Sequence, residues 1–266
     1  IAVYDFQVLT QNQWFPRAFN DWRFVLLVMI GSLAIFPDLG NATILFLVAL
    51  LMYSISGIAH RWFATILGVL TSLSFVSLST IKLVGVDKFS KIPVFGYVAK
   101  RFSAFFNPFD DVAGAGHQLA NSYYAMVNGG WFGLGLGNSI EKRGYLPEAH
   151  TDFVFSIVIE EFGFVGASLI LALLFFLILR IILVGVRAKD PFNSMVAIGI
   201  GGMILIQVFV NIGGISGLIP STGVTFPFLS QGGNSLLVLS VAIAFVLNID
   251  ASEKRAKLYS EYEAQL

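Results

Sequence analysis

Six stretches of apolar residues, separated by polar or glycine- and proline-rich connections, dominate the pattern of the chain. A membrane-spanning helix needs about 20 apolar residues, or somewhat fewer where neighbouring helices bury it. A turn signal, Pro37-Asp-Leu-Gly-Asn41, separates the first two stretches and predicts a helical hairpin. The pattern therefore predicts six transmembrane helices, over residues 24–36, 42–59, 62–86, 151–186, 194–210 and 236–247.

The composition agrees with a polytopic, all-α membrane protein. Of the 266 residues, 56% are hydrophobic and 12% charged, which is more apolar than a soluble domain of this length. The formal net charge is zero and indicates no nucleic-acid partner, and the lack of cysteine excludes disulfides and thiolate sites. The chain starts at Ile1 without a basic segment followed by a short apolar one, so we expect no signal peptide and a missing natural beginning.

Basic residues near the helix ends predict the orientation. The short connections 37–41 and 212–233 contain no Lys or Arg, and such residues are enriched in cytoplasmic loops. We therefore expect one membrane domain, residues 1–266, with a large extracellular loop over 87–150 and a cytoplasmic tail over 251–266. The basic residues assigned to the cytoplasmic side are Arg17, Arg23, Arg61, Arg187, Lys189, Lys254, Arg255 and Lys257.

The charged segment 142–153 leads directly into the fourth apolar stretch. It places Glu148, His150 and Asp152 within five residues at the mouth of a membrane helix. Ionisable groups are costly near hydrocarbon, so this concentration favours chemistry or transport. A continuous helix over residues 151–186 would be about 54 Å long against a hydrocarbon core of about 30 Å, so its ends must project. If its apolar part starts at Phe162, Asp152 stands about 15 Å above the hydrocarbon edge.

Two interpretations of Asp152 fit this position. With Thr151 as a cap, Asp152 in the first helical turn would complement the helix dipole, worth about 0.3–1 kcal/mol. Alternatively, its carboxylate is a general base at the aqueous edge of the membrane, although the dipole would then lower its pKa and weaken it. Periodicity and charge leave both open.

Other polar residues could contact an anionic substrate. Lys142, Arg143 and the Lys100-Arg101 pair could bind phosphate, or could simply form a solvated loop face. The glycine-rich segment 129–137 offers backbone amides but fits no nucleotide-binding motif. The connection 213–235 is too apolar for an exposed loop and too rich in Gly and Pro for one helix. Its polar side chains line a substrate groove or satisfy their own backbone; they are Ser221, Thr222, Ser230, Gln231, Asn234 and Ser235.

Two adjacent acids, Glu160 and Glu161, point in different directions on the predicted helix, so at least one faces the protein interior. A hydrogen-bonded packing role is favoured for them over catalysis. His117 has no second His or Cys at ligand spacing, and the sequence gives no metal motif.

In these motifs the chain resembles the SEDS family (shape, elongation, division and sporulation) of bacterial membrane enzymes that polymerise cell-wall glycan. The similarity covers nearly the whole chain, and its details are closer to division members than to elongation members. The matching elements, in family order, are Phe36-Pro-Asp-Leu-Gly40, Arg101-Phe-Ser-Ala-Phe-Phe-Asn-Pro108, Gly130-Trp-Phe-Gly-Leu-Gly-Leu-Gly-Asn-Ser139, Leu146-Pro-Glu-Ala-His-Thr-Asp-Phe153, Glu160-Glu-Phe-Gly-Phe-Val-Gly166 and Pro227-Phe-Leu-Ser-Gln-Gly-Gly-Asn-Ser235.

The resemblance implies a fold of ten helices, of which the six predicted here look like the last six. It implies a peptidoglycan glycosyltransferase that polymerises lipid II at the division septum, inverts the anomeric carbon and releases undecaprenyl diphosphate. Asp152 matches the family's essential aspartate and would be the catalytic base. The expected partners are a class B penicillin-binding protein, which supplies transpeptidation, and other division proteins.

The resemblance also assigns a substrate-binding set. Lys142 and Arg101 would bind the leaving diphosphate, and a divalent cation (Mg²⁺ or Mn²⁺) could assist them, with no metal ligands assigned. Glu148 and His150 would orient the loop or tune Asp152. The remaining members of the set are Ser139, Gln231, Asn234 and Ser235.

Two further functions remain as alternatives to the enzyme. The first is a transporter that moves lipid II across the membrane, and the second is a division scaffold without catalysis. Translocation predicts polar groups distributed through the membrane depth, whereas catalysis predicts the key acid at the outer face. The densest ionisable cluster is predicted outside, which favours the enzyme.

Overall fold

The computed structural model describes residues 39–55, 101–114 and 116–263. Every regular element in these ranges is helical, so the predicted all-α class is confirmed there. The predicted spans 24–36 and 62–86 lie outside the described residues. The elements are α3 (Leu39–Ile55), α7 (His117–Gly129), the short 3-10 helix η2 (Glu141–Arg143), α8 (Val154–Arg187), α9 (Pro191–Ile215) and α10 (Gly233–Glu263), with a helical stretch over residues 101–106.

Three of the described helices, α8, α9 and α10, are long and apolar enough to cross a membrane. They overlap the three predicted spans that end the chain, and α3 is a shorter apolar helix that overlaps the predicted span 42–59. α9 begins at Pro191, and the Asp190 side chain caps it by accepting the Asn193 N–H at 3.1 Å. α10 continues well past the predicted end at residue 247, because polar pairs one turn apart, such as Lys254 with Asp250 at 2.6 Å, extend the helix.

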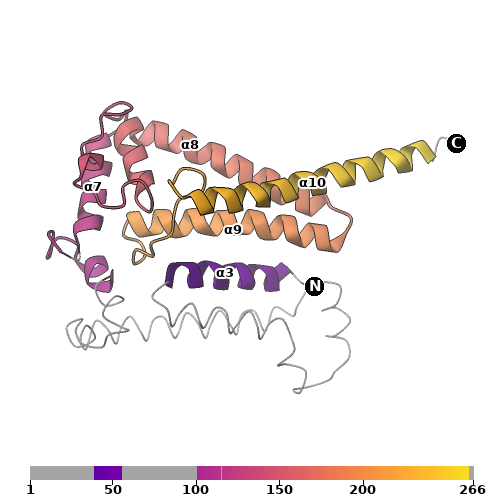
Figure 1. The fold of residues 1–266 in the computed structure, drawn as a ribbon, viewed down its shortest axis with the longest axis horizontal. Coiled ribbons are helices and arrows are strands. Elements are labelled where there is room, and N and C mark those ends of the chain that lie inside the picture. Colours follow the sequence, from indigo (N-terminus) through magenta and orange to yellow (C-terminus); the bar gives the residue numbers. More distant parts are fainter. Residues whose placement is uncertain (1–38, 56–100, 115, 264–266) are drawn as a thin grey trace, which may run out of the picture.

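Small residues let the apolar helices approach one another closely. α8, α9 and α3 run side by side, with α9 between the other two (Figure 1). A β-carbon at Gly201 of α9 would lie 2.7 Å from the Ile182 side chain of α8, and one at Gly185 of α8 would lie 2.8 Å from the Ser194 carbonyl of α9. Close backbone approach of this kind is the usual packing device of membrane helices, and it gives the bundle a fixed geometry.

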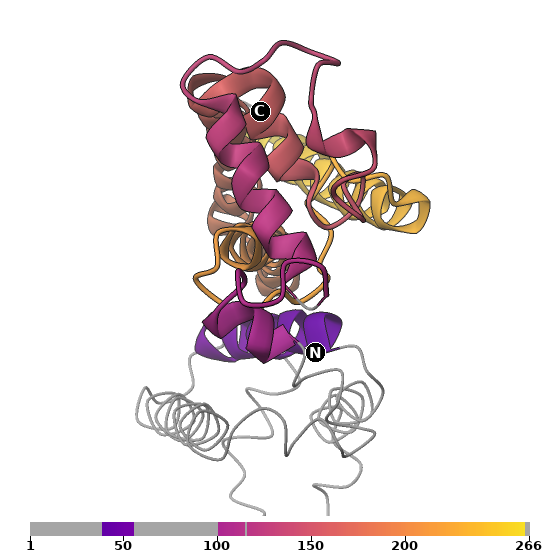
Figure 2. The same ribbon diagram turned by 90° about the vertical axis from the view of Figure 1, so that its left-hand side faces the viewer.

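Helix α7 stands across one end of this bundle (Figures 1 and 2). Its inner face is made of small and polar residues as well as Leu119; Ala120, Ser122 and Ala125 are all fully buried. Because such a face has little hydropathy, the sequence pattern indicated only a long mixed loop here. The predicted loop 87–150 therefore contains a helix that closes the end of the bundle.

Helix α8 is broken at Gly163, whose φ of 70° and ψ of 179° are not helical. The loop after α7 fills the break with four backbone hydrogen bonds. In two of them the loop donates: the amides of Leu134 and Gly135 bind the carbonyls of Glu160 and Glu161 at 2.9 Å. In the other two the loop accepts: the amides of Phe164 and Val165 bind the carbonyls of Gly130 and Trp131 at 2.9 and 3.1 Å. The exchange satisfies groups that the interrupted helix leaves unpaired. The single continuous helix assumed for residues 151–186 is thus wrong.

Candidate active site

A small cleft lies where the segment before α8 meets the end of α9 and the connection to α10. Asp152 and Arg101 line it together with Ser221, Thr222 and Gly223 of that connection. These residues come from three regions far apart in the sequence. The cleft thus joins the predicted base Asp152, the predicted phosphate ligand Arg101 and two of the hydroxyl residues expected to line a groove.

Asp152 sits in a turn rather than in the first turn of the helix, because α8 begins only at Val154. The predicted capping role of Thr151 is wrong, since its hydroxyl donates to the Glu148 carboxylate at 2.6 Å. The turn is instead held through the backbone: the Asn211 amide of α9 donates to the Asp152 carbonyl at 2.7 Å and to the Val224 carbonyl at 2.6 Å. Asn211 therefore fixes the acid and the opposite wall of the cleft at once.

The Asp152 carboxylate and the Arg101 guanidinium converge on Gly223. A β-carbon at Gly223 would lie 3.0 Å from Arg101 Nη2 and 3.3 Å from Asp152 Oδ2. Arg101 is anchored to this wall because its Nη1 donates to the Ser221 carbonyl. At the same wall, Gly40 at the start of α3 packs directly against the Thr222 carbonyl. The absence of a side chain at residue 223 keeps the space between the Asp152 carboxylate and the Arg101 guanidinium open.

The environment of Asp152 raises its pKa above the ordinary aspartate value. The largest cause is burial, which disfavours the charged form, and the Glu148 carboxylate adds to it, whereas Arg101 acts in the opposite direction. The lower pKa expected from the helix dipole is thus wrong, because Asp152 precedes the helix and is half-buried. A raised pKa makes the ionised carboxylate a stronger base than an ordinary aspartate.

Hydrogen bonds attach the connection 216–232 to the segment that carries Asp152. The Ser230 hydroxyl donates to the Thr151 carbonyl at 2.6 Å and accepts the Phe226 N–H at 2.7 Å, and the Gln231 N–H donates to the His150 carbonyl at 2.8 Å. Phe226 also stacks on Phe155, with ring centroids 4.7 Å apart. Irregular backbone of this kind is stable because it is tied to its neighbours.

The predicted substrate ligands around the cleft occupy different places. Glu148 and His150 are exposed on the segment before Asp152, and Glu148 has a left-handed φ of 58°. Gln231 and Asn234 are exposed, and Ser235 is half-buried, at the start of α10. None of these five lines the Asp152 cleft itself, so they form its surroundings and their role in substrate binding stays a prediction.

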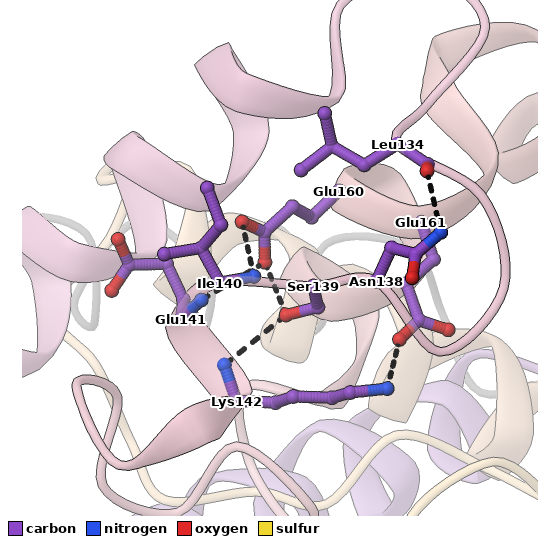
Figure 3. Close-up of polar contacts among 8 residues, drawn as sticks. All are labelled: Leu134, Asn138, Ser139, Ile140, Glu141, Lys142, Glu160 and Glu161. Atoms are coloured by element: carbon purple, nitrogen blue, oxygen red, sulfur yellow. Dashed lines mark hydrogen bonds and ion pairs between the residues drawn. The ribbon is translucent and has the colours of Figure 1, made fainter.

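Lys142 and Ser139 belong to a separate polar cluster around two glutamates of α8 (Figure 3). The Glu160 carboxylate is fully buried and accepts the Ser139 hydroxyl, the Ile140 N–H at 3.1 Å and the Glu141 N–H at 3.4 Å. The Lys142 ammonium pairs with the Glu161 carboxylate. The packing role predicted for these glutamates agrees with this geometry, and Lys142 has a protein partner away from the cleft.

Most of the residues that line the cleft were absent from the sequence-based set, among them Gln118, Asn211 and Gly223. Asn211 was detectable in principle, since an amide inside an otherwise apolar span is costly without partners. Gln118 lies on α7, which the hydropathy pattern missed. Gly223 is one of many glycines in its connection, and nothing in the sequence distinguishes its φ of 75°.

Replacing Gly223 with Ala tests the shape of the cleft. The new methyl would crowd Arg101 and Asp152 and strain a left-handed backbone, so we expect activity at this site to fall by about 10²-fold, as for misplacement by about 1 Å. The measurement is the catalytic rate of the purified variant. Gly137→Ala is the matched control, because its φ of 84° carries the same strain with open space around the β-carbon. Equal losses in both variants would contradict the role of the cleft.

Comparisons with known proteins identify relatives that match most of this chain. A family model described as a cell cycle protein, covering FtsW, RodA and SpoVE, matches residues 8–255. A probable peptidoglycan glycosyltransferase FtsW from Lactococcus lactis is 54% identical over 92% of this chain, and one from Bacillus subtilis is 42% identical over 88%. The chain spans 58% and 56% of the lengths of these two relatives.

The fold is also found among solved structures. A chain from a peptidoglycan synthase complex, described as coordinating polymerization and crosslinking, superposes with a TM-score of 0.66 at 23% identity. The match covers 90% of this chain and 63% of that one. At this identity the likeness shows the fold, and it agrees with the helical architecture described above.

Proposed function

The chain belongs to the FtsW/RodA/SpoVE family of cell cycle proteins, and on this premise we propose that it polymerises lipid II into glycan strands during bacterial cell division. The observation that carries the proposal is that a half-buried carboxylate, Asp152, and the Arg101 guanidinium line one cleft and converge on Gly223. A base beside a fixed positive charge suits a reaction that removes a proton and expels an anion.

In the proposed reaction, Asp152 accepts the proton of an acceptor sugar hydroxyl. The oxygen of that hydroxyl attacks the anomeric carbon of the lipid-linked strand on the face opposite to the diphosphate. The new C–O bond forms as the bond to the diphosphate breaks, and undecaprenyl diphosphate leaves with the electron pair, so the carbon is inverted. The protonated Asp152 then returns its proton to water.

Arg101 supplies positive charge near the leaving group in this proposal. Its guanidinium is fixed on the Ser221 carbonyl, so little ordering remains to be done when the substrate arrives. Lys142, the other predicted diphosphate ligand, would have to give up its pairing with Glu161 to take part. We therefore assign the leading electrostatic role to Arg101.

A divalent cation remains a proposal. Among the described residues, no group of three or more His, Cys, Asp or Glu side chains gathers at one point. Mg²⁺ is commonly held by one or two carboxylates together with substrate phosphates. In this proposal the substrate's diphosphate would hold the cation, which would neutralise charge on the leaving group, and no protein ligand is assigned to it.

The partners and the location follow from the same proposal. A class B penicillin-binding protein would cross-link the new strands, and further division proteins would bring both to the septum. The cleft and α7 would face outward, and the end of α10 would lie in the cytoplasm, as the distribution of Lys and Arg in the short connections predicts.

Lipid II transport and a scaffold role are the alternatives. A purified full-length protein with its transpeptidase partner, given lipid II in detergent, separates them. The enzyme yields glycan strands and free undecaprenyl diphosphate, measured by gel electrophoresis and chromatography. If labelled lipid II is flipped across vesicle membranes and no polymer forms, the protein is a transporter instead. If neither flipping nor polymerisation is detected, the scaffold role is the remaining alternative.

The charges around Asp152 predict opposite shifts of the pH profile. Activity needs the ionised carboxylate, so it is lost as the pH falls through the raised pKa of Asp152. Glu148→Gln removes a charge that raises this pKa, so the acid limb of the rate profile should move to lower pH. Arg101→Gln should move it to higher pH. The rates are measured between pH 4 and 8, and shifts of the same sign would contradict the assignment of Asp152 as the base.

A further inference from the structure

A second cavity lies at the other end of α8, away from Asp152. It is formed by the last two turns of α8, the turn into α9 and α10, and it holds about 500 Å³ including its open mouth. Its charged lining comprises Arg180, Arg187, Asp250, Glu253 and Lys254. The proposed glycan polymerisation uses none of these residues.

The two acids of this cavity already have partners. The Asp250 carboxylate binds the Lys254 ammonium at 2.6 Å. The Glu253 carboxylate accepts the backbone N–H groups of Lys189 and Asp190 at 3.1 and 3.5 Å, which ties α10 to the turn before α9. The negative charge of the lining is therefore largely committed to protein groups.

The two arginines have no such partner. Neither guanidinium forms a hydrogen bond or ion pair with any residue in the described ranges. They are seven residues apart on α8, which is about two helical turns, so both lie on one side of the helix about 10 Å apart along its axis. Side chains of this length can meet around one anion between them.

The position of Arg180 along α8 places its side chain near the membrane surface. The part of α8 beyond the break at Gly163 ends at Arg187, and at 1.5 Å per residue it is about 36 Å long against about 30 Å of hydrocarbon. Arg180 thus starts just inside the hydrocarbon edge, and its side chain can extend outward to the level of lipid phosphates. Arg187 lies at that level directly.

We propose that this cavity binds the headgroup of an anionic phospholipid, with its phosphate held between Arg180 and Arg187. Arginine grips phosphate through a planar fork of donors, and basic pockets between membrane helices are typical sites for such headgroups. A lipid is favoured over free phosphate because exposed apolar residues flank the arginines: Leu179, Leu183 and Val186 are 58%, 39% and 64% exposed. These would contact the acyl chains.

Native mass spectrometry of the full-length protein, released from nanodiscs of equal phosphatidylglycerol and phosphatidylcholine, tests the proposal. The wild type should retain phosphatidylglycerol, and the Arg180→Gln/Arg187→Gln variant should retain about tenfold less. Arg255→Gln is the matched control, because Arg255 is an exposed arginine of α10 outside the cavity lining. Equal retention in the double variant and the control would overturn the site, as would equal retention of the two lipids by the wild type.

A second variant tests the site without removing either arginine. Asp250→Asn releases the Lys254 ammonium into the cavity, so retention of phosphatidylglycerol should rise several-fold; an unchanged or lower value would count against the proposal. Inorganic phosphate at 50 mM is added in a parallel sample. If the bound lipid signal persists there, the acyl chains contribute to binding as proposed, whereas its loss would show that a phosphate group alone is enough to occupy the site and would contradict the preference for a lipid.

Discussion

Asp152→Asn is expected to reduce lipid II polymerisation by about 10²–10⁴-fold, the usual contribution of a general base. The substitution keeps the size of the side chain and removes only its ability to accept the acceptor's proton. Since Asn211 holds Asp152 through its backbone carbonyl at 2.7 Å, the turn should keep its position in the variant. The rate is measured with purified lipid II and the full-length protein with its transpeptidase partner.

Asp110→Asn is the control for this prediction. Asp110 is an exposed carboxylate in the turn that follows the helical stretch 101–106, so it tests for a general effect of lost charge. The variant should polymerise at the wild-type rate. If Asp152→Asn also did so, with a wild-type elution profile on size exclusion, the assignment of Asp152 as the base would be refuted.

Glu160→Ala should have the largest effect on stability, because the Glu160 carboxylate is fully buried among donors. Its removal leaves the Ser139 hydroxyl and the amides of Ile140 and Glu141 without their acceptor. Each unsatisfied buried group costs about 1–3 kcal/mol, so we expect a total loss of several kcal/mol and a fall in melting temperature on the order of 10 °C. Thermal unfolding in detergent, followed by circular dichroism, measures it.

Lys142→Met is the comparison for Glu160→Ala. It breaks the ion pair with Glu161 but leaves the Lys142 backbone, which donates to the Ser139 hydroxyl at 3.1 Å, in place. Because Lys142 is 36% exposed and the backbone amides of Gly137 and Ser139 still donate to Glu161, this loss should cost less than the loss of Glu160. A larger fall in melting temperature for Lys142→Met than for Glu160→Ala would contradict the central position of Glu160 in the cluster.

Among the described residues, the sequence predicted the membrane helices well because apolar length is a strong and local signal. Residues 194–210 and 236–247 fall inside α9 and α10, and the cleft contains both Asp152 and Arg101. What the pattern could not show depends on contacts between distant segments. The break in α8 is stable only because the loop after α7 supplies four backbone partners, and no periodicity in residues 151–186 records those partners.

The candidate site was missed in part for the same reason. Asn211 acts through its reach to two carbonyls, one 59 residues and the other 13 residues away in the chain. Lys142 seemed suited to the substrate because its charge stands beside the acidic segment, but folding brings it to Glu161. Residue type and spacing identified groups capable of the chemistry, whereas tertiary contacts decided which of them meet.

The break in α8 also constrains how related sequences can diverge. Gly133 and Gly163 face each other so closely that a β-carbon on either would overlap the backbone of the other's segment. A second substitution can shorten a side chain but cannot remove backbone atoms. A change at one glycine therefore cannot be compensated by a substitution at the other. Both positions should remain glycine together, and a homologue that lost one would be expected to have rebuilt the whole loop.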